Sequence, residues 1–285
     1  MEQRDAAQDG WLERLQRIDR RYIFILMAVA VIVPIVLEVR LPVGKPTRPV
    51  RLVYDKIDSL PAGSVVLMAY DFGPSSAPEL APMAVAILRH CFSRDIDVVA
   101  VSFYTAGPPL AQGVLDQVAK EFGKKYGENY VNLGYLPGMV PLLIRMSTDI
   151  PGTYKQDYTR TRMSELPLMS RVRSYDDIAL VVDLASSDTP AIWITVVNAR
   201  YQQEVAAGVT AVMAVDYYPY IQSRQLVGML GGLKGAAEYE SLVGRPDEAT
   251  KRMPAQSFAH GLIILLVLLG NTAYVIARIR ARRRA

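Results

Sequence analysis

The chain has 285 residues, of which 51% are hydrophobic and 21% charged, a composition typical of a folded protein and unlike that of a disordered chain. One cysteine, Cys91, and two histidines exclude an internal disulfide framework and argue against a classical zinc site. The net charge of +4 includes a C-terminal arginine cluster, so it gives no separate indication of nucleic-acid binding, and we expect none.

The first 40 residues contain an amphipathic pattern followed by an apolar run. We predict a cytoplasmic arm over 1–21, either on the membrane surface or packed on a partner subunit, from apolar residues at helical spacing among arginines. The run from Tyr22 to Leu37 predicts a transmembrane helix over 22–40, although the run is short and contains Pro34. A secretory signal peptide is the alternative, but no small-x-small cleavage site follows the run. The apolar residues of the arm are Trp11, Leu12, Leu15, Ile18 and Tyr22.

A proline-rich linker over 41–60 leads to a predicted α/β domain over 61–245. Short apolar runs alternate there with helical patterns, which predicts a Rossmann-like, doubly wound, mostly parallel sheet. The segment 149–173 lacks a sustained apolar period, and we expect an extended excursion or a short helix over the sheet. The six predicted strands cover 64–70, 95–104, 130–133, 178–184, 191–197 and 209–215.

The C-terminal region contains the stronger of the two predicted spans. A linker over 246–256 precedes a transmembrane helix over 257–278 and a basic cytoplasmic tail over 279–285. The tail arginines place the C-terminus in the cytoplasm, and two crossings then place the N-terminus there as well. We therefore expect a bacterial or archaeal inner (cell) membrane protein whose central domain is extracytoplasmic.

Candidate binding residues come from the carboxyl ends of the predicted strands, where ligands bind in open parallel sheets. Asp71, Asp183 and Asp216 would together bind a hard cation or supply an acid and a base if they met at one edge. The competing interpretation is that such residues only cap the following helices. No dinucleotide or phosphate-loop motif is present, so no metal and no cofactor is assigned. The candidate ligand-binding residues are Asp71, Ser75, Ser76, Thr105, Asp183, Ser186, Asn198, Asp216 and Tyr217.

A glycine-rich segment follows the last predicted strand. Each glycine inside a helix costs about 1 kcal/mol relative to alanine, so close approach of another backbone is expected to offset the cost. That neighbour is either the sheet of the same domain or another subunit, which makes these glycines candidate interface residues. Together with the preceding DYYPY turn, the segment resembles the end of a sugar-type periplasmic binding domain; no residue role is transferred from that family. The glycines are Gly228, Gly231, Gly232 and Gly235.

Two classes of function compete at this point. A domain held at two points suits a non-catalytic, membrane-anchored scaffold or ligand-sensing subunit of a larger envelope complex, with the lipid bilayer and other membrane subunits, or further copies of the chain, as partners. The alternative is a metal-dependent hydrolase or transferase that uses the aspartate cluster. A transporter accessory protein is a third interpretation.

Overall fold

The computed structural model describes residues 19–39 and 41–284 and divides the chain into two units. One unit runs from Pro42 to Thr250, and the other combines the N-terminal segment up to Leu41 with the segment from Lys251 onward. The amphipathic arm predicted over 1–21 lies almost wholly outside the described residues. We describe each unit by itself.

The larger unit contains a six-stranded, all-parallel sheet, as the sequence predicts. The order of the strands is β3-β2-β1-β4-β5-β6, so the order reverses between β1 and β4. Reversal at this place is the arrangement of Rossmann-type sheets. The strands are β1 (Val65–Asp71), β2 (Asp97–Ser102), β3 (Tyr130–Tyr135), β4 (Leu180–Ala185), β5 (Val205–Val209) and β6 (Met229–Gly231).

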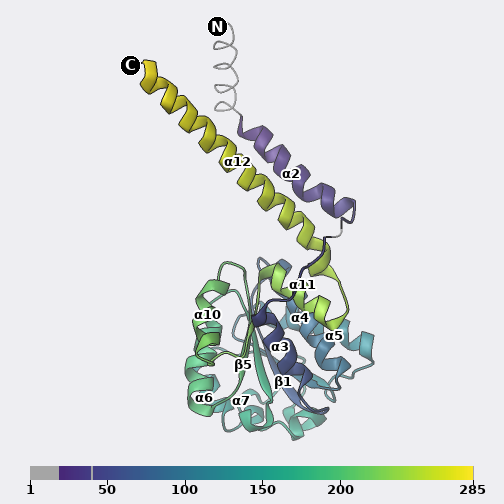
Figure 1. Ribbon diagram of the computed structural model, residues 1–285. Coiled ribbons are helices and arrows are strands. Elements are labelled where there is room, and N and C mark those ends of the chain that lie inside the picture. The colour runs from purple at the N-terminus through teal and green to yellow at the C-terminus, as the bar shows by residue number, and fades with distance from the viewer. Residues whose placement is uncertain (1–18, 40, 285) are drawn as a thin grey trace. The chain divides into compact units, whose positions relative to one another are not determined.

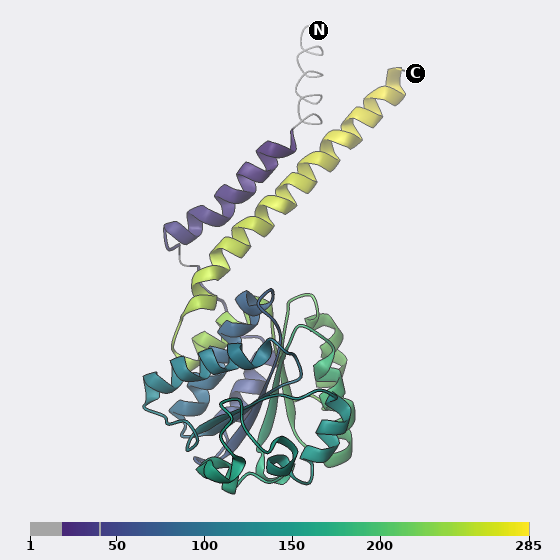
Figure 2. The same cartoon turned by 180° about the vertical axis from the view of Figure 1, so that it is seen from behind.

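Helices cover both faces of this sheet, which explains why the strands are nearly continuous apolar runs (Figures 1 and 2). One layer consists of α3 (Arg48–Asp58), α4 (Ala77–Ser93), α5 (Gly107–Phe122) and α11 (Gly232–Val243). The opposite layer consists of α6 (Met139–Met146), α7 (Ile150–Tyr154), α8 (Thr189–Ile192), a π-helical turn η4 (Trp193–Asn198), α9 (Ala199–Tyr201) and α10 (Ala214–Gln222).

The predicted linker over 41–60 contains helix α3 and belongs to the larger unit. Val50, Val53 and Ile57 recur at helical spacing and are buried against the domain. The proline-rich composition hid this helix, because Pro49 occupies the first turn, where a proline is compatible with a helix. The folded unit therefore begins well before the predicted boundary at residue 61.

Two of the six predicted strands are misplaced. The run 191–197 is helical, in α8 and η4, because Pro190 starts a helix and Trp193, Ile194 and Val197 are buried at helical spacing. The predicted strand over 209–215 begins where β5 ends, and β5 instead covers Val205–Val209. The sixth strand is β6, three residues long, which pairs with β5 inside the segment predicted as a glycine-rich helix.

The predicted excursion over 149–173 packs onto the face of the sheet opposite α4. It contains α7 and two short 3₁₀ turns, η1 (Met163–Glu165) and η2 (Pro167–Ser170), and a third turn, η3 (Tyr175–Asp177), follows it. Ile150, Tyr154, Met169 and Val172 from this segment lie in the core. The excursion is therefore a structural layer that covers the sheet.

The smaller unit is helical. Among the described residues one helix, α12 (Glu248–Arg284), is long and apolar enough to cross a membrane, since Glu248–Ile279 contains an 18-residue window with a mean hydropathy of 2.1. The predicted linker over 246–256 lies largely within this helix. Where the first span is predicted, the structure has α2 (Arg20–Val36), an apolar helix of 17 residues that includes Pro34.

Candidate functional site

Asp71 and Asp183 are brought together at the point where the strand order reverses. Asp71 ends β1, and Asp183 lies inside β4, two positions before its end. Asp183 pairs with Ala69 in the parallel ladder, so Asp183 and Asp71 point to the same face and are diagonal neighbours. The structure therefore brings these two predicted residues together at the reversal point, and ligand binding by them stays a prediction.

Both carboxyl groups are buried, with exposed fractions of 1% for Asp71 and 0% for Asp183. Oδ1 of Asp71 accepts the amide N–H of Phe103 at 2.6 Å and the hydroxyl of Ser102 at 3.4 Å. Oδ2 of Asp71 and both oxygens of Asp183 have no hydrogen-bond partner of good geometry among the described residues. The pair is therefore only partly satisfied.

Burial raises the pKa of both carboxyl groups, because desolvation penalises their charged forms. The proximity of Asp71 raises the pKa of Asp183 further, whereas the Phe103 amide partly offsets the shift at Asp71. Two adjacent buried carboxyls cannot both ionise without large repulsion. The pair therefore holds a proton at pH values where isolated carboxyls have lost theirs.

Two aromatic residues lie near this pair, Tyr154 and Trp193, and neither was selected from the sequence. The hydroxyl of Tyr154 is buried without a partner, and its pKa is raised by burial and by the nearby charges of Tyr175 and Asp71. Trp193, whose Nε1 also has no partner, contacts the ring of Phe103 with centroids 5.9 Å apart. Native structures contain few such groups, so their concentration at one place is unusual.

Tyr217 is the one further predicted site residue in electrostatic reach of the pair. Burial raises its pKa, and Asp183 is the largest charge contribution. Asp216, its neighbour, lies in the first turn of α10. Among the described residues, no group of three carboxylate, histidine or cysteine side chains could hold a metal ion. The three-carboxylate arrangement considered from the sequence is therefore reduced to a pair.

The other predicted ligand-binding residues lie in separate turns, and none of them adds a hydrogen bond to the carboxyl pair. Ser76 precedes α4 without capping it through its side chain, and Thr105 lies in the turn before α5. Asn198 ends η4, and its amide donates to the carbonyl of Gln203 at 2.9 Å. Ligand binding by this set stays a prediction. Its remaining members are Ser75 in the turn after β1 and Ser186 after β4.

Close contacts within the chain explain the glycines of the β6–α11 segment. An added Cβ at Gly228 would lie 2.5 Å from the carbonyl oxygen of Pro49 in α3. Gly232, at the start of α11, has φ +61°, and its Cβ would lie 2.7 Å from that of Ala211. The helix predicted through these positions is wrong at Gly228 and Gly231 but present at Gly232 and Gly235, in α11, and the predicted subunit contact stays a prediction. Added Cβ atoms at Gly231 and Gly235 would likewise lie 2.9 Å and 3.0 Å from Ala214 and Leu230.

Helix α11 also carries two buried carboxylates, which accept hydrogen bonds from the first turns of two other helices, α3 and α12. Glu238 accepts the backbone N–H of Thr47 at 2.9 Å and its hydroxyl at 2.6 Å. Thr47 is the residue that caps α3, the helix that follows the N-terminal segment. A negative charge there satisfies a free helix N–H and complements the helix dipole.

Glu240 plays the same part for α12. Its Oε2 accepts the N–H of Asp247 at 2.8 Å, and the N–H and hydroxyl of Thr250 at 2.9 and 2.6 Å. Its Oε1 accepts the N–H of Ala249 at 3.0 Å. Two positions along a helix differ by about 200°, so Glu238 and Glu240 project from opposite sides of α11. One buried helix thus holds the first turns of both α3 and α12.

No family model, curated protein or solved structure matches this chain. Sequence reasoning selected Asp71 and Asp183 because they follow apolar strands. It missed Glu238 and Glu240, since a Glu-Tyr-Glu step in a helical pattern is typical of a solvated face. The apolar residues that flank Glu238 and Glu240 in α11 are the sequence signal that could have indicated their burial.

Proposed function

We propose that this chain is a membrane-anchored, non-catalytic scaffold or ligand-sensing subunit of a larger envelope complex. The anchor is supported by α12, a helix of 37 residues that contains an 18-residue window with a mean hydropathy of 2.1. At about 1.5 Å per residue, that length exceeds the ~30 Å of a hydrocarbon core. The proposal includes a first span over 22–40, where the structure has the 17-residue helix α2. It places the protein in a bacterial or archaeal cell membrane, with both termini in the cytoplasm and the α/β domain on the extracytoplasmic side.

The observation that carries the proposal is the pair of helix caps from α11. Glu238 holds the start of α3, near the N-terminal end of the domain, and Glu240 holds the first turn of α12, the helix that leaves the domain. Glu238 and Glu240 are 1% and 3% exposed, so the bonds that they accept are protected from water. A domain whose first and last helices are held in this way suits assembly with neighbouring subunits.

The enzymatic alternative, a metal-dependent hydrolase or transferase, draws less support from the described residues. Its two central carboxyls, Asp71 and Asp183, are enclosed by the core, and no third carboxylate joins them. A buried proton-holding pair instead suits a polar contact between β1 and β4.

The mass of the native assembly tests the proposal. The chain, expressed at its natural level and extracted in mild detergent, is expected in a complex much heavier than its 31.6 kDa. Light scattering gives the protein mass free of detergent. A chain that elutes as a monomer after gentle extraction and chemical cross-linking would contradict the scaffold role. Protection of the central domain from protease in right-side-out spheroplasts would contradict the extracytoplasmic placement.

A further inference from the structure

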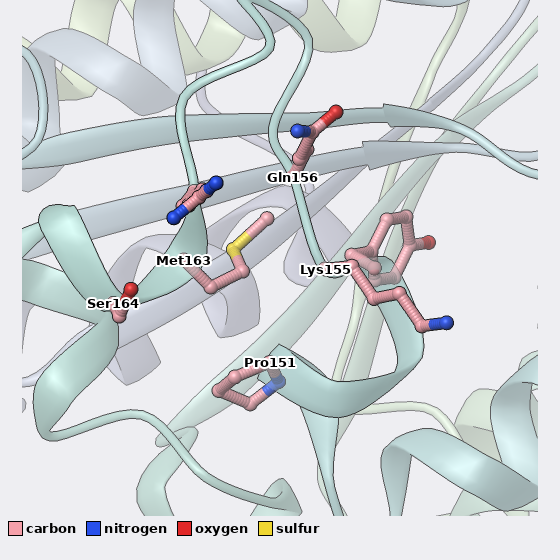
Figure 3. Close-up of a pocket in the computed structure, with 7 residues that line it drawn as sticks. Pro151, Lys155, Gln156, Met163 and Ser164 are labelled. Carbon is pink, nitrogen blue, oxygen red and sulfur yellow. The ribbon is translucent and has the colours of Figure 1, made fainter.

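A pocket of about 690 Å³ lies within the excursion that covers the sheet, and its lining includes Tyr154, the tyrosine near Asp71 (Figure 3). Volumes of this size are typical of small-molecule sites. The pocket is lined by residues of α7 and of the hairpin that follows it. In Figure 3 the side chain of Met163 points into the space between Pro151 and Gln156. The lining residues are Pro151, Tyr154, Lys155, Gln156, Arg162, Met163 and Ser164.

The lining combines apolar walls with positive charge. Pro151, Met163 and the ring of Tyr154 offer apolar contact, while Lys155 and Arg162 each carry a positive charge. No carboxylate lines the pocket, and neither cation forms an ion pair with a described acidic residue. The two charges are therefore not neutralised from within the domain.

Two acidic residues near the cations in sequence are committed to other bonds. Asp149 accepts the N–H of Gly152 at 2.9 Å, as the cap of α7. Asp157 accepts the hydroxyl of Tyr126 at 2.5 Å and the N–H of Thr161 at 2.8 Å. These bonds fix the hairpin that presents the cations and hold the carboxylates in place.

The backbone at the pocket is also held in an unfavourable conformation. Lys155 has φ +58° and ψ −43°, outside the region that a lysine ordinarily adopts. Its N–H donates to Pro151 at 2.8 Å and its carbonyl accepts from Met163 at 3.1 Å, which keeps this geometry. Gln156 and Arg162, which both line the pocket, are partners in an antiparallel bridge. Strain of this kind concentrates at binding sites, where it orients a side chain.

We propose that this pocket binds a small organic anion, with its carboxylate or phosphate on Arg162 and its apolar body against Met163 and Pro151. A guanidinium binds either group through two parallel hydrogen bonds, which favours Arg162 as the principal contact. This inference gives the ligand-sensing part of the proposed function a site and rests on it only in that respect. Binding is measured on the chain alone, so its failure is distinct from that of the assembly.

Titration calorimetry on the full chain in detergent tests the pocket, with phenyl phosphate and phenylacetate as anionic probes and benzyl alcohol as the neutral match. We expect one saturable site for the anions, weakened by added salt, and at least tenfold tighter binding than for the alcohol. Arg162→Gln is expected to weaken anion binding about tenfold or more. Arg160→Gln, which removes the same charge outside the lining, is expected to change it less than about twofold.

Several results would overturn the pocket assignment. The assignment fails if neither anion shows saturable binding, or if benzyl alcohol binds with the same affinity as the anions. It also fails if Arg160→Gln and Arg162→Gln lose the same amount of anion affinity. Inorganic phosphate that binds as tightly as phenyl phosphate would overturn the role of the apolar wall. Thermal unfolding of each variant shows whether the fold is intact. If Arg162→Gln fails to fold, Lys155→Gln removes the other cation of the lining and tests the same prediction.

Discussion

Replacement of Glu240 by glutamine tests directly how α12 is joined to the domain. The change keeps the size of the side chain but removes its charge and one acceptor. Oε2 accepts three of the four bonds, so the glutamine oxygen is expected to take that place. The new amide group then faces the N–H of Ala249, which loses its acceptor. The predicted damage is therefore greatest at Ala249 and smaller at Thr250.

The magnitude follows from the bonds that are lost or weakened. A buried donor left without a partner costs about 1–3 kcal/mol, and a charged bond that becomes neutral loses about 1 kcal/mol more. At Ala249 alone, the orphaned donor in Glu240→Gln is expected to destabilise the first turn of α12 by about 1–3 kcal/mol. Protection of the Ala249 amide from hydrogen exchange should fall by about tenfold to a hundredfold.

Hydrogen exchange on the full chain in detergent micelles is the assay, with a crossed design. Glu240→Gln should deprotect Ala249 and Thr250 and leave Thr47 unchanged relative to the amides of β4. Glu238→Gln should show the opposite pattern. Glu128→Gln, a surface change on the same fold, should alter none of them. Equal exchange at Ala249 in wild type and in Glu240→Gln would refute the capping argument.

Three further predictions concern the core and the close contacts. The raised pKa values of Asp71 and Asp183 mean that, above about pH 4, the folded state binds more protons than the unfolded state, so the free energy of unfolding should fall as pH rises toward neutral. Asp183→Asn should reduce this slope by at most about 1.4 kcal/mol per pH unit, as measured by denaturant titrations at several pH values. Tyr154→Phe removes a hydroxyl without a partner and should be neutral or stabilising, whereas Tyr175→Phe breaks a 2.9 Å bond and should cost about 1 kcal/mol by urea unfolding. Gly228→Ala should cost about 1–3 kcal/mol through its clash with α3, whereas Gly113→Ala, with no atom within 4 Å, should stabilise its helix by about 0.5–1 kcal/mol in thermal melts.

Each of these predictions has a result that would contradict it. An unfolding free energy of wild type that rises between pH 4 and 7, with Asp183→Asn showing the same slope, would contradict the shared-proton interpretation. Equal destabilisation by the two tyrosine changes would mean that the Tyr154 hydroxyl has a partner. A Gly228→Ala variant as stable as wild type would mean that α3 moves freely away from β6.

The parallel sheet was predictable because its strands are buried on both faces and read as short apolar runs. VVLMA in β1 and LVVDLA in β4 are such runs, and their ends identified Asp71 and Asp183. Residues that lie at neighbouring strand ends must come close in a parallel sheet. That part of the site therefore needed no knowledge of tertiary contacts.

The errors arose where local pattern and tertiary context disagree. The run around Trp193 is β-branched and apolar, and only Pro190 indicated that it begins as a helix. Strand β6 is too short to show a period, and its stability comes from pairing with β5. Glu238 and Glu240 were missed because their partners, Thr47 and Thr250, are distant in sequence or across a turn.

The central claim is that the tethered domain, whose helices α3 and α12 begin at turns held by α11, assembles with partner subunits. The most direct measurement is the mass of the native complex from cells that carry either the wild-type chain or the Glu238→Gln/Glu240→Gln double variant at equal expression. We predict that the wild-type chain is found in a complex much heavier than 31.6 kDa and that the double variant, still folded, is largely lost from it. A double variant that loses both caps by hydrogen exchange yet assembles to the same mass would contradict the claim.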